Sequence, residues 1–265
     1  MPPPRTVASG TSPEQWFREL PPMTKILFST CLLLAACTTM SILGENSLVL
    51  YWPLIKSRFE IWRLFTPFLY AGKFGMPFCM HLYMLYTNSL SYERSAFNTG
   101  AGGTSADMLF MTLFGMLSFT LIDIFVMGPM MILSSQLLYM IVYMRSRRDP
   151  HSIQKIFTIP IPMFYLPWVY VGIAVLMGNS PYPALIGIFV GHVFYFFTQE
   201  FPKISGFDLL LTPRFCCDLM SYMGAPASNG GGIAGGFGGS PASSSSSSGN
   251  SGGFRWGRGR TLGSR

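Results

Sequence analysis

A pattern of the form Gly-x-Ser-Gly, which would suit a serine nucleophile, occurs at residues 249–252. A working nucleophile needs a base beside it and a backbone fixed around it. The sequence from about 225 to 253 is instead dominated by glycine and serine, a composition that cannot bury enough apolar surface to fold. We therefore interpret this motif as a chance product of composition.

Two other serines, Ser134 and Ser135, stand inside an apolar segment. The sequence from Gly128 to Ser135 contains no Gly-x-Ser-Gly, and neither serine has the flanking glycines that open backbone space for an oxyanion hole. We therefore expect no catalytic residue in this segment.

Five cysteines show no disulfide framework and no zinc-ligand spacing, so we expect no metal and no cofactor. They are Cys31, Cys37, Cys79, Cys216 and Cys217. The adjacent pair at 216 and 217 follows the last apolar segment and could be acylated, but an unmodified juxtamembrane pair is the interpretation that we favour.

The C-terminal residues hold a short peptide with two apolar anchors. Trp256 and Leu262 are six residues apart, and Gly257, Gly259 and Gly263 surround them. Because nothing in the preceding Gly/Ser-rich sequence could bury the tryptophan, we expect the peptide to be presented to a groove on a soluble partner.

Three polar residues stand in the second apolar segment. At 100° per residue, His81, Asn88 and Tyr92 fall within about 40° of one another on one helix face. Polar groups inside a membrane avoid lipid, so this face should turn toward the bundle. It could line a water-filled groove that spares a polar chain part of its desolvation cost, or it could make ordinary interhelical hydrogen bonds. The sequence leaves both open.

Composition places these residues in a membrane protein. The chain has 265 residues, of which 49% are hydrophobic and only 11% charged, against roughly 25% charged in soluble domains. The net charge of +7 fits attraction to anionic lipid headgroups better than nucleic-acid binding, since no basic stripe with interleaved aromatics appears.

Six apolar segments predict six membrane helices, because each is continuously apolar and none alternates like a barrel strand. They cover residues 26–43, 77–92, 108–127, 129–144, 163–178 and 183–199. Segments of 16 residues span only about 24 Å, against a hydrocarbon core of roughly 30 Å. Either they thin the bilayer locally or their true boundaries are wider.

Basic residues set the orientation. The loop after the fourth segment holds Arg145, Arg147, Arg148 and Lys155, whereas the loops after the third and fifth hold no Lys or Arg. The basic loop should therefore be cytosolic, and with an even number of spans both termini are cytosolic too.

The segment from 44 to 75 would then be luminal despite its basic residues. Its aromatic and proline content suggests a partly embedded interfacial element. Within it, Trp62 would anchor at headgroup depth, while Arg63 could bind lipid phosphate or neighbouring carbonyl groups.

Some residues have structural interpretations. Gly187 and Gly191 leave a flat strip on the sixth helix for close helix packing. Glu93 and Asp107 flank the second and third helices and should cap and tie their loop. Asp123, in an apolar run, could reach the interface.

The sequence resembles the derlins, rhomboid-related pseudoproteases of the endoplasmic reticulum membrane, over nearly the whole membrane part. The matching residues are Trp16-Phe17, Pro21-Pro22, Trp62-Arg63, Ala106-Asp107, Phe110-Met111, Tyr165-Leu166-Pro167-Trp168, Gly191-His192 and Thr212-Pro213. The tail peptide also resembles the short box with which derlins hold the p97-type AAA ATPase, also known as valosin-containing protein.

The resemblance implies an all-α polytopic membrane protein with a six-helix rhomboid-like fold and a disordered cytosolic tail. The expected parts are a cytosolic segment at 1–22, the membrane domain at 23–215, a flexible linker at 216–253 and the ATPase-binding motif at 254–265.

It also implies a non-catalytic role in endoplasmic-reticulum-associated degradation, in which misfolded proteins return to the cytosol. Expected partners are the ATPase, a membrane ubiquitin ligase complex, misfolded clients, lipid, and further copies of this chain or other subunits. His192 would stand at the histidine position of an active rhomboid protease, but we favour a packing role for it. An active intramembrane serine protease and a small channel are the alternatives.

Overall fold

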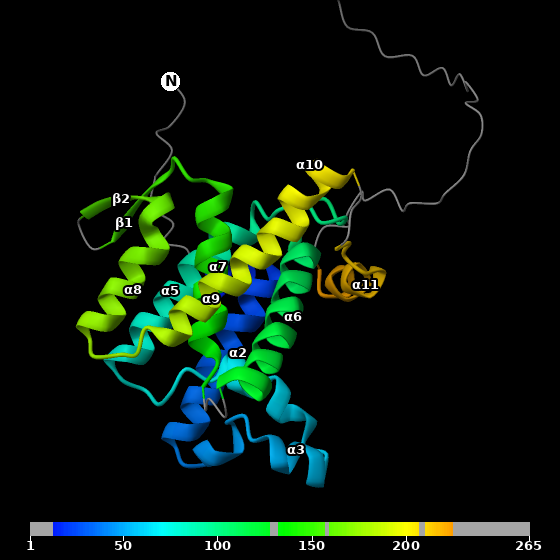
Figure 1. Ribbon diagram of the computed structural model, residues 1–265. Coiled ribbons are helices and arrows are strands. Elements are labelled where there is room, and N and C mark those ends of the chain that lie inside the picture. The colour runs from blue at the N-terminus through cyan, green and yellow to red at the C-terminus, as the bar shows by residue number, and fades with distance from the viewer. Residues whose placement is uncertain (1–12, 128–131, 157–158, 207–209, 225–265) are drawn as a thin grey trace, which may run out of the picture. The chain divides into compact units, whose positions relative to one another are not determined.

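Six long helices form the body of the protein, one for each predicted apolar segment (Figure 1). They are α2 (Pro22–Thr39), α5 (Met76–Glu93), α6 (Ser105–Ile122), α7 (Ser134–Arg148), α8 (Leu166–Leu176) and α9 (Tyr182–Tyr195). The computed structural model describes residues 13–127, 132–156, 159–206 and 210–224. The predicted helical class is confirmed for this part of the chain.

Three stretches of the described residues are long and apolar enough to cross a membrane. They are Pro22–Thr39, Ser105–Phe125 and Tyr182–Ser205. The second and third include π-helical turns that prolong α6 (Asp123–Met127) and α9 (Phe196–Glu200), and α9 then continues into α10 (Phe201–Ser205). A fourth apolar helix, Met163–Leu176, is shorter.

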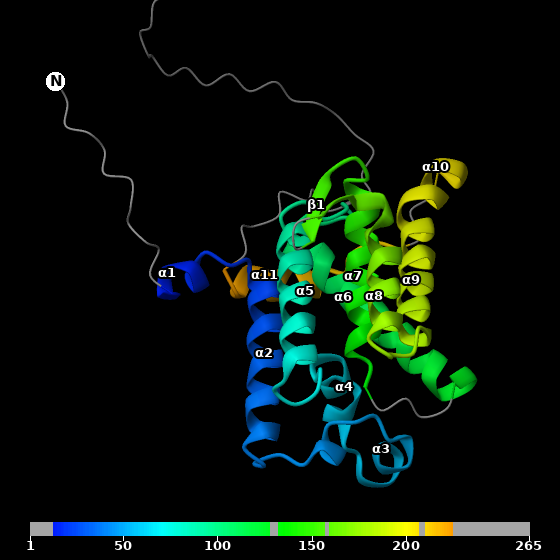
Figure 2. The same ribbon diagram turned by 90° about the vertical axis from the view of Figure 1, so that its left-hand side faces the viewer.

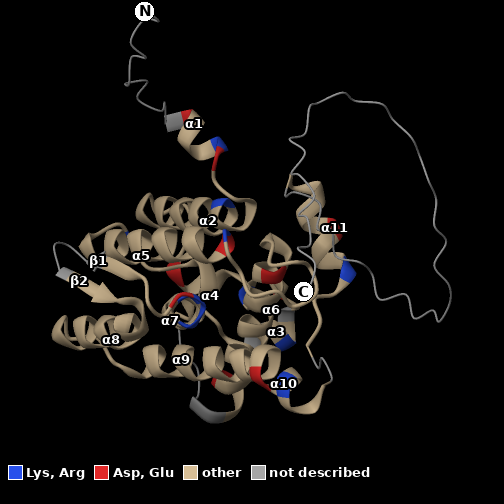
Figure 3. Ribbon diagram, turned by 90° about the horizontal axis from the view of Figure 1, so that it is seen from above, with Lys and Arg blue, Asp and Glu red and all other residues tan. Residues whose placement is uncertain are grey.

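Helix α7 is the core of the bundle. Every residue from 136 to 146 is buried. Viewed from above, α7 is seen end-on with α5, α6, α8 and α9 around it (Figure 3). A helix that is covered on all sides can be apolar around its whole circumference, which explains why its sequence reads as one continuous segment.

The predicted range of this helix was wrong. It begins at Ser134 and ends at Arg148, rather than covering 129–144. Arg145, Arg147 and Arg148 therefore belong to its last turn and not to a loop. Arginine is a good helix former, and cations at a helix C-terminus interact favourably with its unpaired carbonyl groups.

A β-hairpin follows α7, and this hairpin was not predicted from the sequence. Strand β1 (Ile153–Ile156) pairs antiparallel with β2 (Ile159–Pro162), and Ile153 faces Pro162 in the register. We call this side of the bundle the hairpin end and the other side the opposite end. The hairpin is a small β addition to the helical fold.

Short helices fill the segment between α2 and α5. They are η1 (Glu45–Ser47), α3 (Trp52–Arg58), η2 (Ile61–Leu64) and α4 (Thr66–Leu69). In Figure 2, α3 and α4 lie at the opposite end, away from β1. Aromatic side chains in this segment are exposed, including Trp52, Phe59 and Trp62.

Two short helices flank the body in sequence. Helix α1 (Pro13–Arg18) precedes α2, and α11 (Arg214–Tyr222) follows α10. Helix α11 covers positions that we expected in the linker, so helical structure continues past residue 215 to Tyr222. Apolar residues at 216 and 220 pack this helix against the body, which is why the chain does not leave earlier.

Candidate functional site

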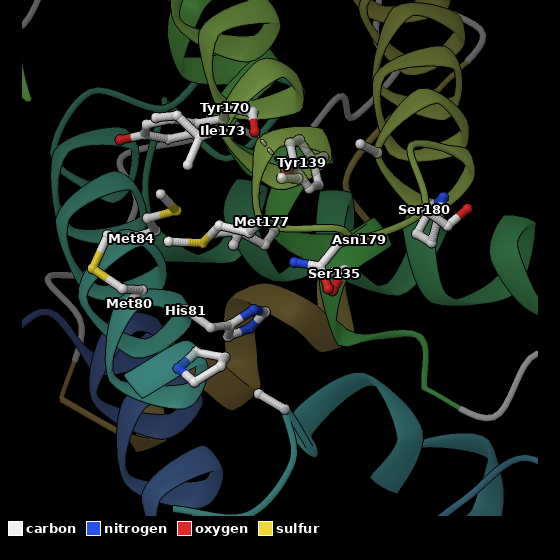
Figure 4. Close-up of a pocket in the computed structure, with 16 residues that line it drawn as sticks. Met80, His81, Met84, Ser135, Tyr139, Tyr170, Ile173, Met177, Asn179 and Ser180 are labelled. Atoms are coloured by element: carbon white, nitrogen blue, oxygen red, sulfur yellow. Dashed lines mark hydrogen bonds between the residues drawn. The ribbon is translucent and has the colours of Figure 1, made fainter. Parts of the chain in front are cut away.

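A cavity of about 320 Å³ lies among α5, α7, α8 and the start of α9 (Figure 4). It is lined by Ala71, Pro77, Met80, His81, Met84, Ser135, Leu138, Tyr139, Tyr170, Ile173, Ala174, Met177, Asn179, Ser180, Pro183 and Ala184. Most of these residues belong to the opposite-end halves of their helices, or to the α8–α9 connection.

The cavity combines a few polar groups with an adaptable apolar wall. Polar side chains come from three elements, with His81 on α5, Ser135 on α7 and Asn179 in the α8–α9 connection. Three methionines supply flexible thioether side chains that fit irregular ligands. Such a lining could hold an extended polar segment within an otherwise apolar surrounding.

The predicted polar stripe on α5 is divided between two environments. His81 lines the cavity, whereas Asn88 and Tyr92 do not. The side chain of Tyr92 is 1% exposed. In the described structure the three residues therefore do not line one common cavity.

Asn88 instead belongs to a buried hydrogen-bond chain. Arg145 donates from Nη1 to Asn88 Oδ1 at 2.8 Å and from Nη2 to Gln154 Oε1 at 2.7 Å. Asn88 Nδ2 donates to Met84 O at 2.7 Å. Because Arg145 is buried, these amide oxygens replace the water that its charge would otherwise need. These hydrogen bonds join α5, α7 and β1.

His192 is not paired with Ser134 or Ser135. Its Nδ1 lies 2.7 Å from the hydroxyl oxygen of Tyr143, two turns farther along α7 than the serines. Ser134 Oγ is buried with no hydrogen-bond partner among the described residues. The structure therefore gives His192 the interhelical hydrogen bond that a packing role requires.

Two glycines bring α9 against α7. A Cβ atom at Gly187 would lie 2.4 Å from Gln136 O, and one at Gly191 would lie 3.0 Å from Tyr143 Cδ1. Only glycine allows this backbone approach at position 187. The close contact also sets the position of His192 beside Tyr143.

Ser135 shares the cavity with a different histidine, His81. No acidic residue is among those that line the cavity, so nothing there could orient the imidazole as the third member of a triad does. Within the described residues, no group of three His, Cys, Asp or Glu side chains could hold a metal ion.

Glu93 caps the first long helix from across the bundle. Its carboxylate accepts hydrogen bonds from the backbone N–H groups of Met23 and Thr24 at 2.8 and 2.6 Å, and from Thr24 Oγ1 at 2.6 Å. The first turn of a helix leaves N–H groups unpaired, and a negative charge is favourable there.

Asp107 holds together the loop before α6 and the chain before α11. Its carboxylate accepts from Thr99 Oγ1 at 2.7 Å and Thr212 Oγ1 at 2.6 Å. It also accepts from the backbone N–H groups of Ala101, Gly103 and Thr104. The predicted capping role is thus wider than one loop. Asp123 is buried and not at the surface.

Arg63 binds protein carbonyl groups. Its Nη1 donates to Asn46 O at 2.6 Å and Val49 O at 3.1 Å, and its Nε pairs with Glu60. The neighbouring Trp62 is 55% exposed. The pair therefore combines a buried brace for the loop with an exposed aromatic ring.

The adjacent cysteines differ in environment. Cys216 is buried against the body, and burial raises the pKa of its thiol to about 11. It is therefore protonated and a poor nucleophile at neutral pH. Cys217 is only partly buried.

The tail positions Trp256, Gly257, Gly259, Leu262 and Gly263 lie outside the described residues. Sequence reasoning also missed most of the cavity wall, including Tyr139, Tyr170 and Met177. No single-helix periodicity could have found these residues, because they come together only when four helices pack.

The fold and the site define a helical membrane protein in which, among the described residues, neither His81 nor His192 is hydrogen-bonded to a serine. A family model for the Der1-like family matches residues 20–214. The chain belongs to this family. The match ends before the tail peptide, which is therefore outside it.

Similar proteins cover most of the chain. A probable derlin-2 homolog of Dictyostelium discoideum is 34% identical over 215 residues, which is 78% of this chain and 82% of that protein. Derlin-1.2 of Zea mays is 32% identical over 206 residues, or 77% and 83% of the two chains. Derlin-1 of Arabidopsis thaliana is 28% identical over 222 residues, or 83% and 82%. Family membership supports a role in endoplasmic-reticulum-associated degradation in general.

Proposed function

We propose that this chain is a non-catalytic component of endoplasmic-reticulum-associated degradation that assists the passage of misfolded proteins to the cytosol. The observation that carries the proposal is the family match over residues 20–214. In this proposal all six helices cross the endoplasmic reticulum membrane, the hairpin end is cytosolic and the segment at 44–75 is luminal.

The cavity would receive a polar client segment from the luminal side. Its position near the α8–α9 connection and its mixed lining support this assignment. Ala174→Phe should narrow the cavity and slow turnover of a misfolded client at unchanged protein level. Val175→Phe places the same ring at a neighbouring position that does not line the cavity, and client turnover should stay normal. Equal turnover in both variants would contradict the assignment.

The tail would recruit the p97-type AAA ATPase. Trp256 and Leu262 would enter apolar pockets, Gly257 and Gly259 would allow the bend, and the arginines would add electrostatic attraction. Replacing Trp256 and Leu262 with alanine should abolish co-purification of the ATPase while membrane insertion is unchanged. Ser264→Ala serves as the control, and ATPase binding that survives the double replacement would exclude this role of the tail.

Pull-down from gently solubilised membranes would identify the remaining partners. We expect a membrane ubiquitin ligase complex, misfolded clients and further derlin subunits, and no nucleic acid. Recovery of none of these with an otherwise intact protein would count against the degradation role.

An intramembrane serine protease is a second candidate, since Ser135 and His81 line one cavity. We expect a serine-reactive fluorophosphonate probe to leave the purified protein unlabelled. Labelling that is lost in Ser135→Ala, but retained in Ser134→Ala, would establish the protease instead. Solute flux in protein-containing liposomes would favour a channel.

A further inference from the structure

Arg147 is held between two aromatic rings at the end of α7. Its guanidinium carbon lies 5.1 Å from the ring centre of Tyr143 and 5.2 Å from that of Phe164. Such cation–π contacts fix the plane of a guanidinium group while leaving its edge available for hydrogen bonds. The residue is partly buried, so this arrangement is a built feature and not a freely moving surface side chain.

Tyr143 connects Arg147 to His192 through hydrogen bonds. Its hydroxyl oxygen accepts from Arg147 Nε at 2.9 Å and lies 2.7 Å from His192 Nδ1. Arginine is always a donor, so the single hydroxyl hydrogen of Tyr143 is free to be donated to Nδ1. His192 then accepts at Nδ1 and carries its proton on Nε2, which makes Nε2 a donor.

The donors that remain have no acceptor among the described residues. Apart from the bond to Tyr143, Arg147 makes no hydrogen bond or ion pair there. The carboxylate of Glu200 accepts at Oε1 from Tyr195 at 3.0 Å and from Lys203 at 3.1 Å, and no hydrogen bond or ion pair joins it to Arg147. Two nitrogens of Arg147 and Nε2 of His192 are left to bind something else.

These donors face the lipid side of the bundle. His192 is exposed on α9, in line with Phe189 and Phe196, which are 61% and 40% exposed. In Figure 1, α8 and α9 diverge from their connection at the opposite end, and the hairpin-end half of α7 lies between them. Unpaired donors beside hydrocarbon are costly, so the site needs an acceptor that reaches it from the membrane.

We propose that Arg147 and His192 bind the phosphate group of an anionic glycerophospholipid in the leaflet at the hairpin end. A guanidinium edge and an imidazole N–H match phosphate oxygens, which accept several hydrogen bonds at once. Arg145 shares the last turn of α7 with Arg147, so the local charge favours a headgroup without its own cation. The proposal does not depend on the role in protein degradation.

Binding of a fluorescent phosphatidic acid to the full-length protein in neutral detergent micelles tests the proposal. Arg147→Gln should weaken binding about ten-fold, and Tyr143→Phe, which keeps the ring but removes the hydroxyl, should weaken it about three-fold or more. Arg148→Gln is the matched control, because Arg148 is the next residue and also lies over a ring, that of Phe97, at 5.2 Å. We expect it to change the affinity less than about two-fold.

Equal weakening by Arg147→Gln and Arg148→Gln would reduce the effect to general surface charge and overturn the site. Unchanged binding in both Arg147→Gln and Tyr143→Phe would overturn it as well.

Inorganic phosphate and unlabelled phosphatidic acid are compared as competitors. Displacement by the lipid alone supports the proposal, whereas equal displacement by inorganic phosphate would assign the site to a free anion. Thermal unfolding of each variant in the same detergent excludes a folding defect, and Arg147→Lys should recover part of the affinity if the variant with glutamine unfolds.

Discussion

Ionised side chains inside the body act as joints between segments that are distant in sequence. Glu93 closes the first turn of α2, Asp107 connects α6 to the chain before α11, and Arg145 connects α7 to α5 and β1. Each of these groups has hydrogen-bond partners that offset the loss of water around its charge. Removing one member should therefore leave several buried groups unpaired.

Asp107→Ala should lower the stability of the body. Removing a cap costs about 0.5–2 kcal/mol, and each buried donor left unpaired adds about 1–3 kcal/mol, so we expect a loss of at least about 2 kcal/mol. Thermal unfolding in detergent measures it. Asp149→Ala, at an exposed position after α7, should leave the unfolding midpoint nearly unchanged. Similar midpoints for both variants would contradict the role assigned to Asp107.

The reactivity of Cys216 should follow its environment. Because burial raises the pKa of its thiol to about 11, the thiolate fraction is small at pH 7 and increases as pH rises toward that value. We expect maleimide to modify Cys217→Ser protein slowly at residue 216, with a rate that increases from pH 7 to pH 9. Mass spectrometry of the peptide measures it, and rapid modification at pH 7 would show that Cys216 is accessible.

Helices α7 and α9 approach each other closely at two glycines. Among the described glycines, a Cβ added at Gly187 would come nearest to a neighbouring atom. Gly187 meets the backbone of α7 at Gln136, and one turn later Gly191 meets the ring of Tyr143. The cavity at the opposite end of α7 and the pair of Arg147 and His192 at its hairpin end both depend on the position of α9. A shift of this helix would therefore disturb both sites.

Gly187→Ala should separate the two helices. The added Cβ would lie 2.4 Å from a backbone oxygen, which cannot move aside like a side chain. Overpacking of this kind costs about 1–3 kcal/mol. Gly172→Ala on α8 is the matched control, since a Cβ there meets nothing within 4 Å and alanine favours a helix by up to about 1 kcal/mol. In thermal unfolding, the midpoint of Gly187→Ala should lie below that of the wild type and the midpoint of Gly172→Ala above it.

Helix α11 has two distinct faces. Cys216 and Met220 are buried, whereas Phe215, Leu219 and Tyr222 are exposed apolar or aromatic residues at helical spacing. Figure 2 shows α11 and α1 lying across the long helices, at the level where α2 begins. An exposed apolar face at that level is typical of a helix that lies in a membrane interface.

For the whole molecule, continuous apolar sequence was enough to predict six helices, because helix formation in lipid depends on composition and length. The ends of α7 and the hairpin at 153–162 were missed, since the basic residues were interpreted as a loop. The cavity could be anticipated only through His81. Asn88 lies on the same helix face as His81 but is hydrogen-bonded to the buried Arg145. The periodicity of one helix cannot predict a contact between positions so far apart in sequence.

In the proposed arrangement α8 crosses the membrane, and its short length then predicts a dependence on bilayer thickness. Its 11 residues, Leu166–Leu176, rise only about 16 Å, well below a hydrocarbon core of roughly 30 Å. Mismatch has a free-energy cost for each ångström, so the protein should unfold at a higher temperature in bilayers of short-chain lipids than in bilayers of long-chain lipids. Nanodiscs that differ only in acyl-chain length test this, and equal midpoints would contradict it.

The hydrogen bonds from Met23 and Thr24 to Glu93 also have a consequence for biogenesis. The first long helix obtains its capping carboxylate from a residue about 70 positions later, which a ribosome adding about 5–20 residues per second delivers only after several seconds. During that interval the start of α2 has to rely on water or on the insertion machinery. Helices α2 and α5 should therefore settle in the membrane as a pair, and a nascent chain arrested before residue 93 should leave α2 more open to exchange.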